Sequence, residues 1–142
     1  MALAFYTNAI GDNAGVTDLM EWMRITPEGN IGIGTSTPQA KLDVKGKILA
    51  EEVEIKVRSG ADFVFEPSYN LKPLAEVEAF VKENKHLPEI PSEKEMVEKG
   101  VNVNEMQIKL LQKIEELTLY TIQLEKNYIE LKQKLEQLEQ NK

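Results

Sequence analysis

LLQKIEELTLYTIQLEKNYIELKQKLEQL, residues 110–138, carries a leucine at every seventh position. Residues at the intervening positions complete a heptad pattern, which places one continuous stripe along a helix. No Gly or Pro interrupts the chain from residue 104 to residue 142, and NEMQ at its start is a capping-box pattern. A single helix of about 38 residues, about 57 Å long, is therefore expected. The predicted coiled-coil core is Leu110, Ile114, Leu117, Thr121, Leu124, Tyr128, Leu131, Leu135 and Leu138.

A helix of this length exceeds what so small a chain can cover, so its stripe predicts association with copies of the same helix. A parallel dimer prefers β-branched residues at the positions of Ile114, Thr121, Tyr128 and Leu135, and the last two are bulky without a β-branch. We therefore expect a parallel trimer, with a dimer as the alternative. A long amphipathic helix packed on a neighbouring domain is the weaker interpretation, because five leucines keep strict seven-residue spacing.

Residues 1–58 have a different period, with short strand-like segments separated by turn residues. The segments are LAFYT, MEWMRIT, NIGIG and AKLDVKGKI, followed by apolar residues that alternate with charged ones from residue 52 to residue 57. Each apolar face has only two or three side chains, so the strands are expected to pair with other parts of the chain or with copies of it. The predicted packing residues of this β-rich shaft are Ile31, Gly32, Ile33, Gly34, Leu42, Val44, Val53, Ile55 and Val57.

The stretch GNIGIGTSTP, residues 29–38, contains three glycines within six residues. A P-loop requires Lys after its last glycine and the dinucleotide fingerprint requires a third glycine, but Thr35 and Thr37 stand at those positions. Nucleotide binding is therefore not expected. Glycine in a strand often marks the close approach of another backbone. This favours a crowded threefold axis or a tight sheet contact over the alternative of a bulge or flexible hairpin.

Residues 59–103 mix both periods and predict a small α/β knob. DFVF is expected to form a buried strand, and Pro73 to begin a helix that ends near Asn84. The capping-box pattern SEKE begins a short helix that ends at Gly100. The predicted core of the knob is Phe63, Phe65, Leu74, Val77, Phe80 and Val81.

The 142-residue chain has a net charge of −7 and no cysteine. None of its three zones is net positive, which argues against binding to a nucleic-acid backbone. Without cysteine there is no disulfide, thiolate metal site or Cys nucleophile. No segment approaches the roughly twenty apolar residues of a membrane span. We expect neither nucleic acid nor membrane insertion, and we expect that a missing N-terminal portion holds an attachment site.

His86 is the only histidine, and no nucleophile motif or carboxylate cluster accompanies it. We interpret it as a loop residue that caps a helix end or packs on Pro88, rather than as a general base or metal ligand. Trp22, Tyr6 and Phe5 could form a sugar-stacking platform, but packing in a core or subunit interface is the favoured interpretation. No catalytic, cofactor-binding or metal-binding residue is assigned, and the chain is not expected to be an enzyme.

The sequence EWMRITPEGNIGIGTSTPQAKLDVKGKI resembles a segment that precedes the C-terminal region of phage tail-fibre and tail-spike proteins and related bacterial surface fibres. DFVFEPSYNLKPLAEVEAFVKENKHLPEIPS and GVNVNEMQIKLLQKIEELTLY resemble the C-terminal module of many such proteins. The resemblance covers about residues 20–125. It implies a homotrimeric fibre whose C-terminal module helps three chains register and fold, with Gly32 and Gly34 where strands of the trimer crowd together.

Many phage fibres end in an intramolecular chaperone of the S74 peptidase type, which uses a Ser and a Lys to cut itself off the mature trimer. At the comparable junction, VRSGADFVFE, Ser59 is followed by Gly60 in place of Asp, and no Arg or Lys occurs between Ser59 and Lys72. The resemblance therefore implies a non-cleaving trimerisation module. A self-cleaving chaperone is the less favoured alternative.

These observations predict an elongated α+β homotrimer, with an intertwined β-rich shaft at 1–58, an α/β knob at 59–103 and a C-terminal parallel trimeric coiled coil at 104–142. The expected function is that of a structural fibre protein of a phage, a phage-tail-like particle or a cell-surface appendage, outside the cell or on a virion. Expected partners are copies of the chain and the rest of the fibre. The alternative function is an adhesin tip that binds a host receptor or glycan. No cofactor is expected.

Overall fold

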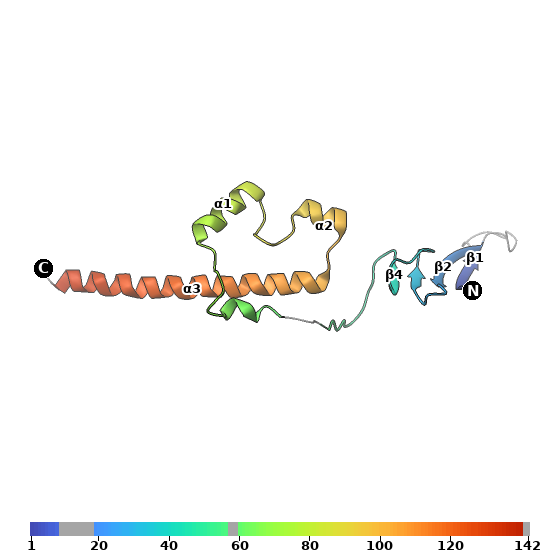
Figure 1. Cartoon of the computed structure of the whole chain (residues 1–142), viewed down its shortest axis with the longest axis horizontal. Helices are drawn as coiled ribbons and strands as arrows, with labels where there is room; N and C mark the ends of the chain where they lie inside the picture. The colour runs from blue at the N-terminus through green and yellow to red at the C-terminus, as the bar shows by residue number, and fades with distance from the viewer. Residues whose placement is uncertain (9–18, 57–59, 141–142) are drawn as a thin grey trace. The chain divides into compact units, whose positions relative to one another are not determined.

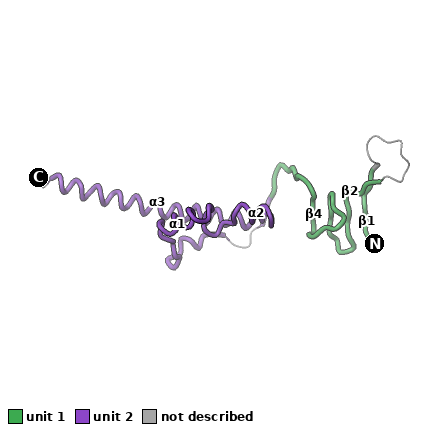
Figure 2. The backbone as a smooth tube through the Cα atoms, turned by 90° about the horizontal axis from the view of Figure 1, so that it is seen from above, with its two compact units in different colours: residues 1–53 green, residues 54–142 purple. Residues whose placement is uncertain are grey.

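The computed structural model describes residues 1–8, 19–56 and 60–140. The chain forms two compact units, Met1–Val53 and Glu54–Lys142 (Figure 2). In the described residues, unit 1 contains a four-stranded sheet and unit 2 contains three α-helices. The α+β class predicted from the sequence is therefore confirmed. The predicted knob and the predicted long helix both belong to unit 2.

The sheet of unit 1 consists of β1 (Leu3–Asn8), β2 (Leu19–Ile25), β3 (Ile31–Ile33) and β4 (Leu42–Val44) (Figure 1). Its strand order is β1-β2-β3-β4, with β1 and β3 antiparallel to β2 and with β3 parallel to β4. Period-two alternation and turn residues predict all four strands. β3 and β4 lie within the predicted segments, whereas β1 and β2 each extend one residue beyond LAFYT and MEWMRIT.

Each glycine of the GNIGIG stretch is required by the fold of a single chain. Gly29 (φ +75°) closes the β2–β3 turn, where its N–H donates to the Thr26 carbonyl at 3.0 Å. A Cβ on Gly32 would lie 2.3 Å from the Thr35 carbonyl oxygen, and Gly34 has φ +73°. The close approach of another backbone was correctly predicted, but this backbone belongs to the same chain. The glycines therefore do not indicate a threefold axis.

Unit 1 has almost no interior of its own. Among its described residues only Gly32 and Pro38 are buried. Large apolar side chains on its strands are 41% to 57% exposed, namely Leu3, Phe5, Tyr6, Leu19, Met20, Trp22, Ile33 and Leu42. Small sheets need a covered apolar face for independent stability, so this sheet requires something else to cover it.

The strand predicted around Val53, Ile55 and Val57 is not formed in the single chain. The described residues 45–56 contain no strand, and Val53 and Ile55 are 70% and 42% exposed. Val57 lies outside the described residues. A segment with this alternating pattern forms a strand only when a neighbouring strand can pair with its backbone N–H and C=O groups. The described part of unit 1 provides no such neighbouring strand here.

Unit 2 contains the 3₁₀ turn η1 (Asp62–Phe65) and the helices α1 (Leu74–Asn84), α2 (Glu93–Lys99) and α3 (Val103–Gln140). Pro73 precedes the first residue of α1, as predicted. The predicted capping box of α2 is present, because Ser92 Oγ accepts from the Glu95 N–H at 3.3 Å and the Glu95 carboxylate accepts from the Ser92 N–H at 3.0 Å. α3 is 38 residues long, as the unbroken pattern predicts.

The strand predicted for DFVF is wrong, because these residues form η1. Only Val64 points inward, at 1% exposed, whereas Phe63 and Phe65 are 45% and 54% exposed. The described part of unit 2 contains no strand that could pair with this segment, so a tight turn satisfies its backbone locally. Of the other predicted core residues, Leu74 is 49% exposed and three are partly buried: Val77, Phe80 and Val81.

The N-terminus of α3 is capped by Asn102, two residues before the predicted cap. Asn102 Oδ1 accepts from the Glu105 N–H at 3.1 Å, whereas the Oδ1 of Asn104 is buried without a partner. Asn102→Ala is expected to cost about 1 kcal/mol of unfolding free energy. Asn104→Ala is the matched control and should cost less, because it removes an unpaired acceptor. Chemical denaturation measures both, and equal losses would contradict this assignment.

Candidate functional site

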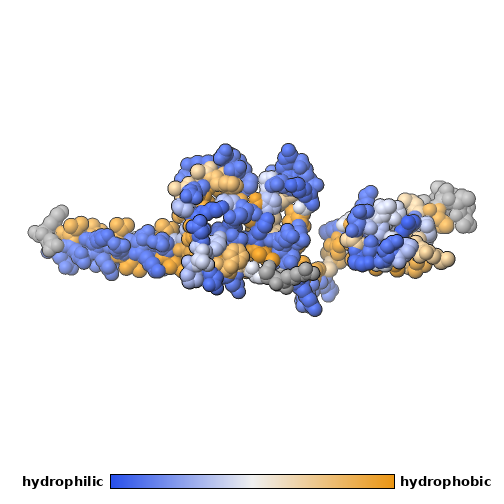
Figure 3. All heavy atoms as spheres, viewed as in Figure 1, coloured by the Kyte–Doolittle hydropathy of each residue, from blue (hydrophilic) through white to orange (hydrophobic). Residues whose placement is uncertain are grey.

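All nine residues of the predicted heptad stripe lie on α3, and all are exposed. The eight apolar ones are 47% to 67% exposed, from Leu110 at 47% to Leu138 at 67%. Figure 3 shows apolar residues together with hydrophilic ones along the part of α3 that extends beyond the knob. A soluble helix normally buries such a stripe. The stripe is therefore an apolar surface that the described part of unit 2 leaves uncovered.

The rest of unit 2 covers other sides of α3 and leaves the stripe free. The buried residues of α3 are Lys113 and Glu115, which are 9% and 7% exposed. Both lie beside the stripe residue Ile114, which is 59% exposed. From residue 121 to residue 140 every residue of α3 is exposed. The single chain thus covers both flanks of Ile114 and leaves Ile114 itself exposed.

A partly buried ion-pair cluster attaches the knob to α3. The ammonium of Lys113 lies 2.5 Å from Glu89 Oε2 and 2.9 Å from both carboxylate oxygens of Glu116. Glu89 also pairs with Lys72 at 2.9 Å. Glu89 lies in the loop between α1 and α2 and has φ +66°. Its carboxylate therefore connects this loop to α3 and to the segment before α1.

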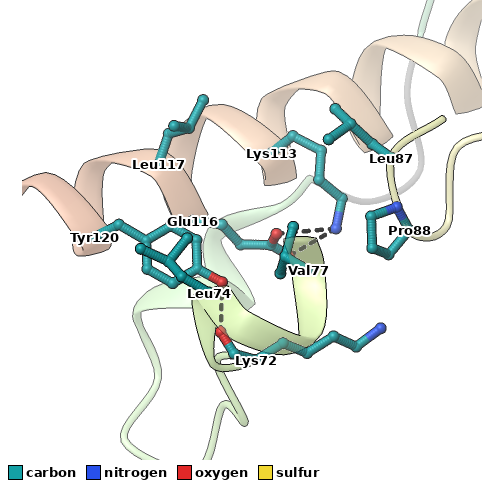
Figure 4. Close-up of a pocket in the computed structure, with 9 residues that line it drawn as sticks. All are labelled: Lys72, Leu74, Val77, Leu87, Pro88, Lys113, Glu116, Leu117 and Tyr120. Atoms are coloured by element: carbon teal, nitrogen blue, oxygen red, sulfur yellow. Dashed lines mark hydrogen bonds and ion pairs between the residues drawn. The ribbon is translucent and has the colours of Figure 1, made fainter. Parts of the chain in front are cut away.

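Hydrogen bonds from uncharged side chains extend the cluster. Tyr69 donates to Glu116 Oε1 at 2.5 Å, and the Gln112 amide donates to the Tyr69 hydroxyl, to Glu89 and to Glu116 at 2.9 to 3.1 Å. Tyr120 donates to the Lys72 carbonyl at 2.6 Å (Figure 4). Networks in which most polar groups find partners favour a unique arrangement, so these bonds fix how the knob sits on α3.

The local field favours the charged form of the ion pairs. The hydrogen bond from Lys113 lowers the pKa of Glu89. Burial raises the pKa of Glu116, but hydrogen bonds from Lys113, Tyr69 and Gln112 outweigh it and the net pKa is lowered. Burial likewise lowers the pKa of Lys113, while its bonds to Glu116 and Glu89 raise it overall. The cluster is therefore ionised at neutral pH.

The attachment of the knob is expected to weaken as the pH falls below the ordinary glutamate pKa of about 4.3. Because folding lowers the pKa of Glu89 and Glu116, the stabilisation is complete above that pH and is lost as the pH falls through the lowered values. Thermal unfolding measured from pH 7 to pH 3 tests this. Glu116→Gln should flatten the pH dependence, whereas Glu125→Gln, at an exposed position of α3, should keep it. Equal slopes for wild type and Glu116→Gln would contradict the prediction.

An apolar cavity of about 140 Å³ lies between α3 and the start of α1, beside the ion pairs (Figure 4). Leu117 belongs both to the stripe and to the cavity wall. Close backbone approach to α3 comes from η1 rather than from α1. The residues that line the cavity are Lys72, Leu74, Val77, Leu87, Pro88, Lys113, Glu116, Leu117 and Tyr120. No pattern in the sequence predicts this cavity.

His86 lies just after the C-terminal end of α1. His86 Nδ1 lies 3.0 Å from the Leu87 carbonyl, and its ring stands edge-on to Phe80 with centroids 5.4 Å apart. The histidine thus packs on the end of α1.

In the described residues, no three His, Cys, Asp or Glu side chains gather closely enough to hold a metal ion. Over the same ranges, no helix has the length and hydropathy that a membrane crossing requires.

The aromatic residues of unit 1 do not form one platform. Trp22 is 49% exposed, and its indole N–H donates to Thr7 Oγ1 at 2.7 Å. Phe5 pairs with Met23 and Tyr6 with Glu21, positions that alternate with Trp22 along β2. Residues directly opposite in a sheet share a face, so Trp22 lies on the other face from Phe5 and Tyr6. This arrangement does not favour a glycan-stacking site.

Comparison with protein-family models, with curated proteins and with solved structures gave no match to this chain.

Proposed function

We propose that this chain is the C-terminal part of a homotrimeric tail fibre or surface fibre, in which α3 forms a parallel three-stranded coiled coil that brings three chains into register. The observation that carries the proposal is the exposure of all nine heptad positions along α3. Burial of apolar surface across such a seam stabilises the assembly by about 25 cal/mol per Å². This is the main force available for assembly. The protein has a structural role and is not an enzyme.

The sheet of unit 1 supports the same proposal independently. With only Gly32 and Pro38 buried among its described residues, the sheet gains little stability from one chain alone. Association of three chains brings three such sheets to a high effective concentration, so that their exposed apolar side chains can cover one another. The extended segment of Val53 and Ile55 then gains neighbours for strand pairing. α3 thus nucleates assembly, and the shaft forms from that end.

The resemblance of residues 20–125 to fibre proteins supplies the biological setting. It supports a location outside the cell, on a virion, a phage-tail-like particle or a cell-surface appendage. The partners are two further copies of the chain and the remainder of the fibre. Because Ser59 is followed by Gly60 and no Arg or Lys occurs between Ser59 and Lys72, the module is retained after assembly rather than cut off.

Light scattering coupled to size-exclusion chromatography tests the proposal, with intact mass spectrometry on the same sample. The expected result is an uncut chain with a solution mass three times the 16.1 kDa of one chain. A monomer or dimer would overturn the trimeric fibre, and a shortened chain would favour the self-cleaving alternative. A chain ended after Leu110 is expected to aggregate, and soluble trimers of it would refute the nucleating role of α3.

A further inference from the structure

The cavity beside α3 opens next to the heptad stripe. One of its walls is Leu117, a stripe residue that is 62% exposed. The opposite wall includes Leu74 and Leu87, which are 49% and 44% exposed although they lie in a pocket (Figure 4). Exposed leucines on both sides of an apolar pocket show that the single chain does not fill it. Its volume of about 140 Å³ is close to that of engineered apolar cavities of about 150 Å³, which accept a benzene-sized group.

The other flank of the stripe carries two exposed isoleucines that the heptad core does not use. Ile122 and Ile129 are 42% and 48% exposed, and each follows a stripe residue directly, Thr121 and Tyr128. They are one heptad apart and similarly exposed. Neither of them lines the cavity of its own chain.

Parallel coiled coils bring these two flanks together between neighbouring chains. In such a coil, the residue directly before each of the heptad positions of Ile114, Thr121, Tyr128 and Leu135 faces the next helix. The residue that it faces there lies about five positions further along the sequence. Lys113 therefore faces the level of Thr118 of the next chain, and Tyr120 faces the level of Glu125. The cavity spans the interval between Lys113 and Tyr120. On the facing flank of the next helix, the exposed apolar residue within the corresponding interval is Ile122.

We propose that Ile122 of one chain inserts into the cavity between α1 and α3 of its neighbour. This inference rests on the proposed parallel trimer and names a second contact within it. The contact is heterologous, since a cavity on one flank receives a residue from the other flank, and three such contacts close a ring. Each knob then holds two helices of the coil, its own through the ion pairs of Lys113 and the next through Ile122. Ile129, one heptad further, lies beyond the knob and has no cavity to enter.

Engineered cysteines test the contact in the full chain, which has no cysteine of its own. The variant Leu74→Cys/Ile122→Cys is oxidised under mild conditions and run on a denaturing gel, with Leu74→Cys/Ile129→Cys as the matched control. Covalent dimers and trimers are expected from the first variant and single chains from the control. Equal linkage in both variants, or single chains from both, would overturn the contact.

A second measurement does not depend on disulfide geometry. Ile122→Ala is expected to lower the Tm of the trimer by about 5 °C or more, because it empties an apolar site, whereas Ile129→Ala is expected to change it much less. Light scattering on the same samples separates the two proposals. If the protein is a trimer and the two alanine variants have the same Tm, the proposed Ile122 contact is wrong but the proposed coiled coil stands. A monomeric wild type would overturn both.

Discussion

Leu124→Asp is expected to dissociate the assembly into single chains. Leu124 is 58% exposed in one chain, so its replacement removes no packing within the chain. In a three-stranded seam the same position would bring three carboxylates together in an apolar layer, where unpaired charges are strongly unfavourable. Light scattering at several concentrations should show a solution mass that falls from three times 16.1 kDa to a single 16.1 kDa.

Gln123→Asp is the matched control, because it introduces the same residue at the adjacent exposed position of α3. This variant should keep the trimer mass. Circular dichroism should also lose helical signal in Leu124→Asp, since isolated helical segments of this kind are only marginally stable in water. An unchanged mass for Leu124→Asp would remove the stripe from the interface. Dissociation of both variants would show that charge on α3, rather than the stripe, controls assembly.

Gly32→Ala is expected to unfold the sheet of unit 1. An added Cβ would lie 2.3 Å from the carbonyl oxygen of Thr35, 3.3 Å from its Cγ2 and 3.4 Å from Pro38. The nearest of these atoms belongs to the backbone, so rotation of a side chain cannot relieve the contact. Overpacking of this kind costs about 1–3 kcal/mol or more, and unit 1 has almost no buried surface to offset it. Hydrogen exchange of the full chain should show loss of protection at the Gly34 and Lys45 amides, which donate to Trp22 and Ile33.

Ser36→Ala provides the control for Gly32→Ala, because Ser36 is exposed in the same loop. It should leave exchange across β2 and β3 unchanged. Gly34→Ala should have an intermediate effect, since its cost comes from φ +73° and from a contact of 3.2 Å with the Lys45 carbonyl. Wild-type protection in Gly32→Ala would mean that the loop from residue 35 to residue 38 rearranges freely.

Local signals in the sequence predicted the elements of this fold well. Heptad leucines, the Ser92 capping box and alternation in the first four strands depend on neighbours within a few residues, and α3, α2 and β1 to β4 were found where expected. The strands predicted at DFVF and around Val53 were wrong for the single chain. Alternation of apolar and polar residues indicates that successive side chains point to opposite faces. A strand also needs a second strand with which to form hydrogen bonds, and the sequence does not show which segment that is.

Less of the candidate site could be predicted from the sequence. The stripe was predicted residue by residue, and its exposure in one chain agrees with a surface that remains to be covered. The cluster of Glu89, Lys113 and Glu116 was missed. Lys113 and Glu116 are three residues apart on a helix, a spacing that permits pairing. Glu89, by contrast, lies in a loop that is distant in sequence, and its own backbone has φ +66°. Such a long-range contact leaves no periodic signal.

The order of the two units along the chain has a consequence for synthesis. At about 5–20 residues per second, the ribosome completes the exposed strands of unit 1 roughly 4 to 18 seconds before α3 is finished. During that time nascent sheets on neighbouring ribosomes have unpaired edges. The edge strand β4 contains only three residues, Leu42–Val44, and short edge strands limit pairing with foreign chains. The brevity of β4 thus limits foreign pairing at this edge, and the longer edge strand β1 (Leu3–Asn8) is the one left open to other copies of the chain.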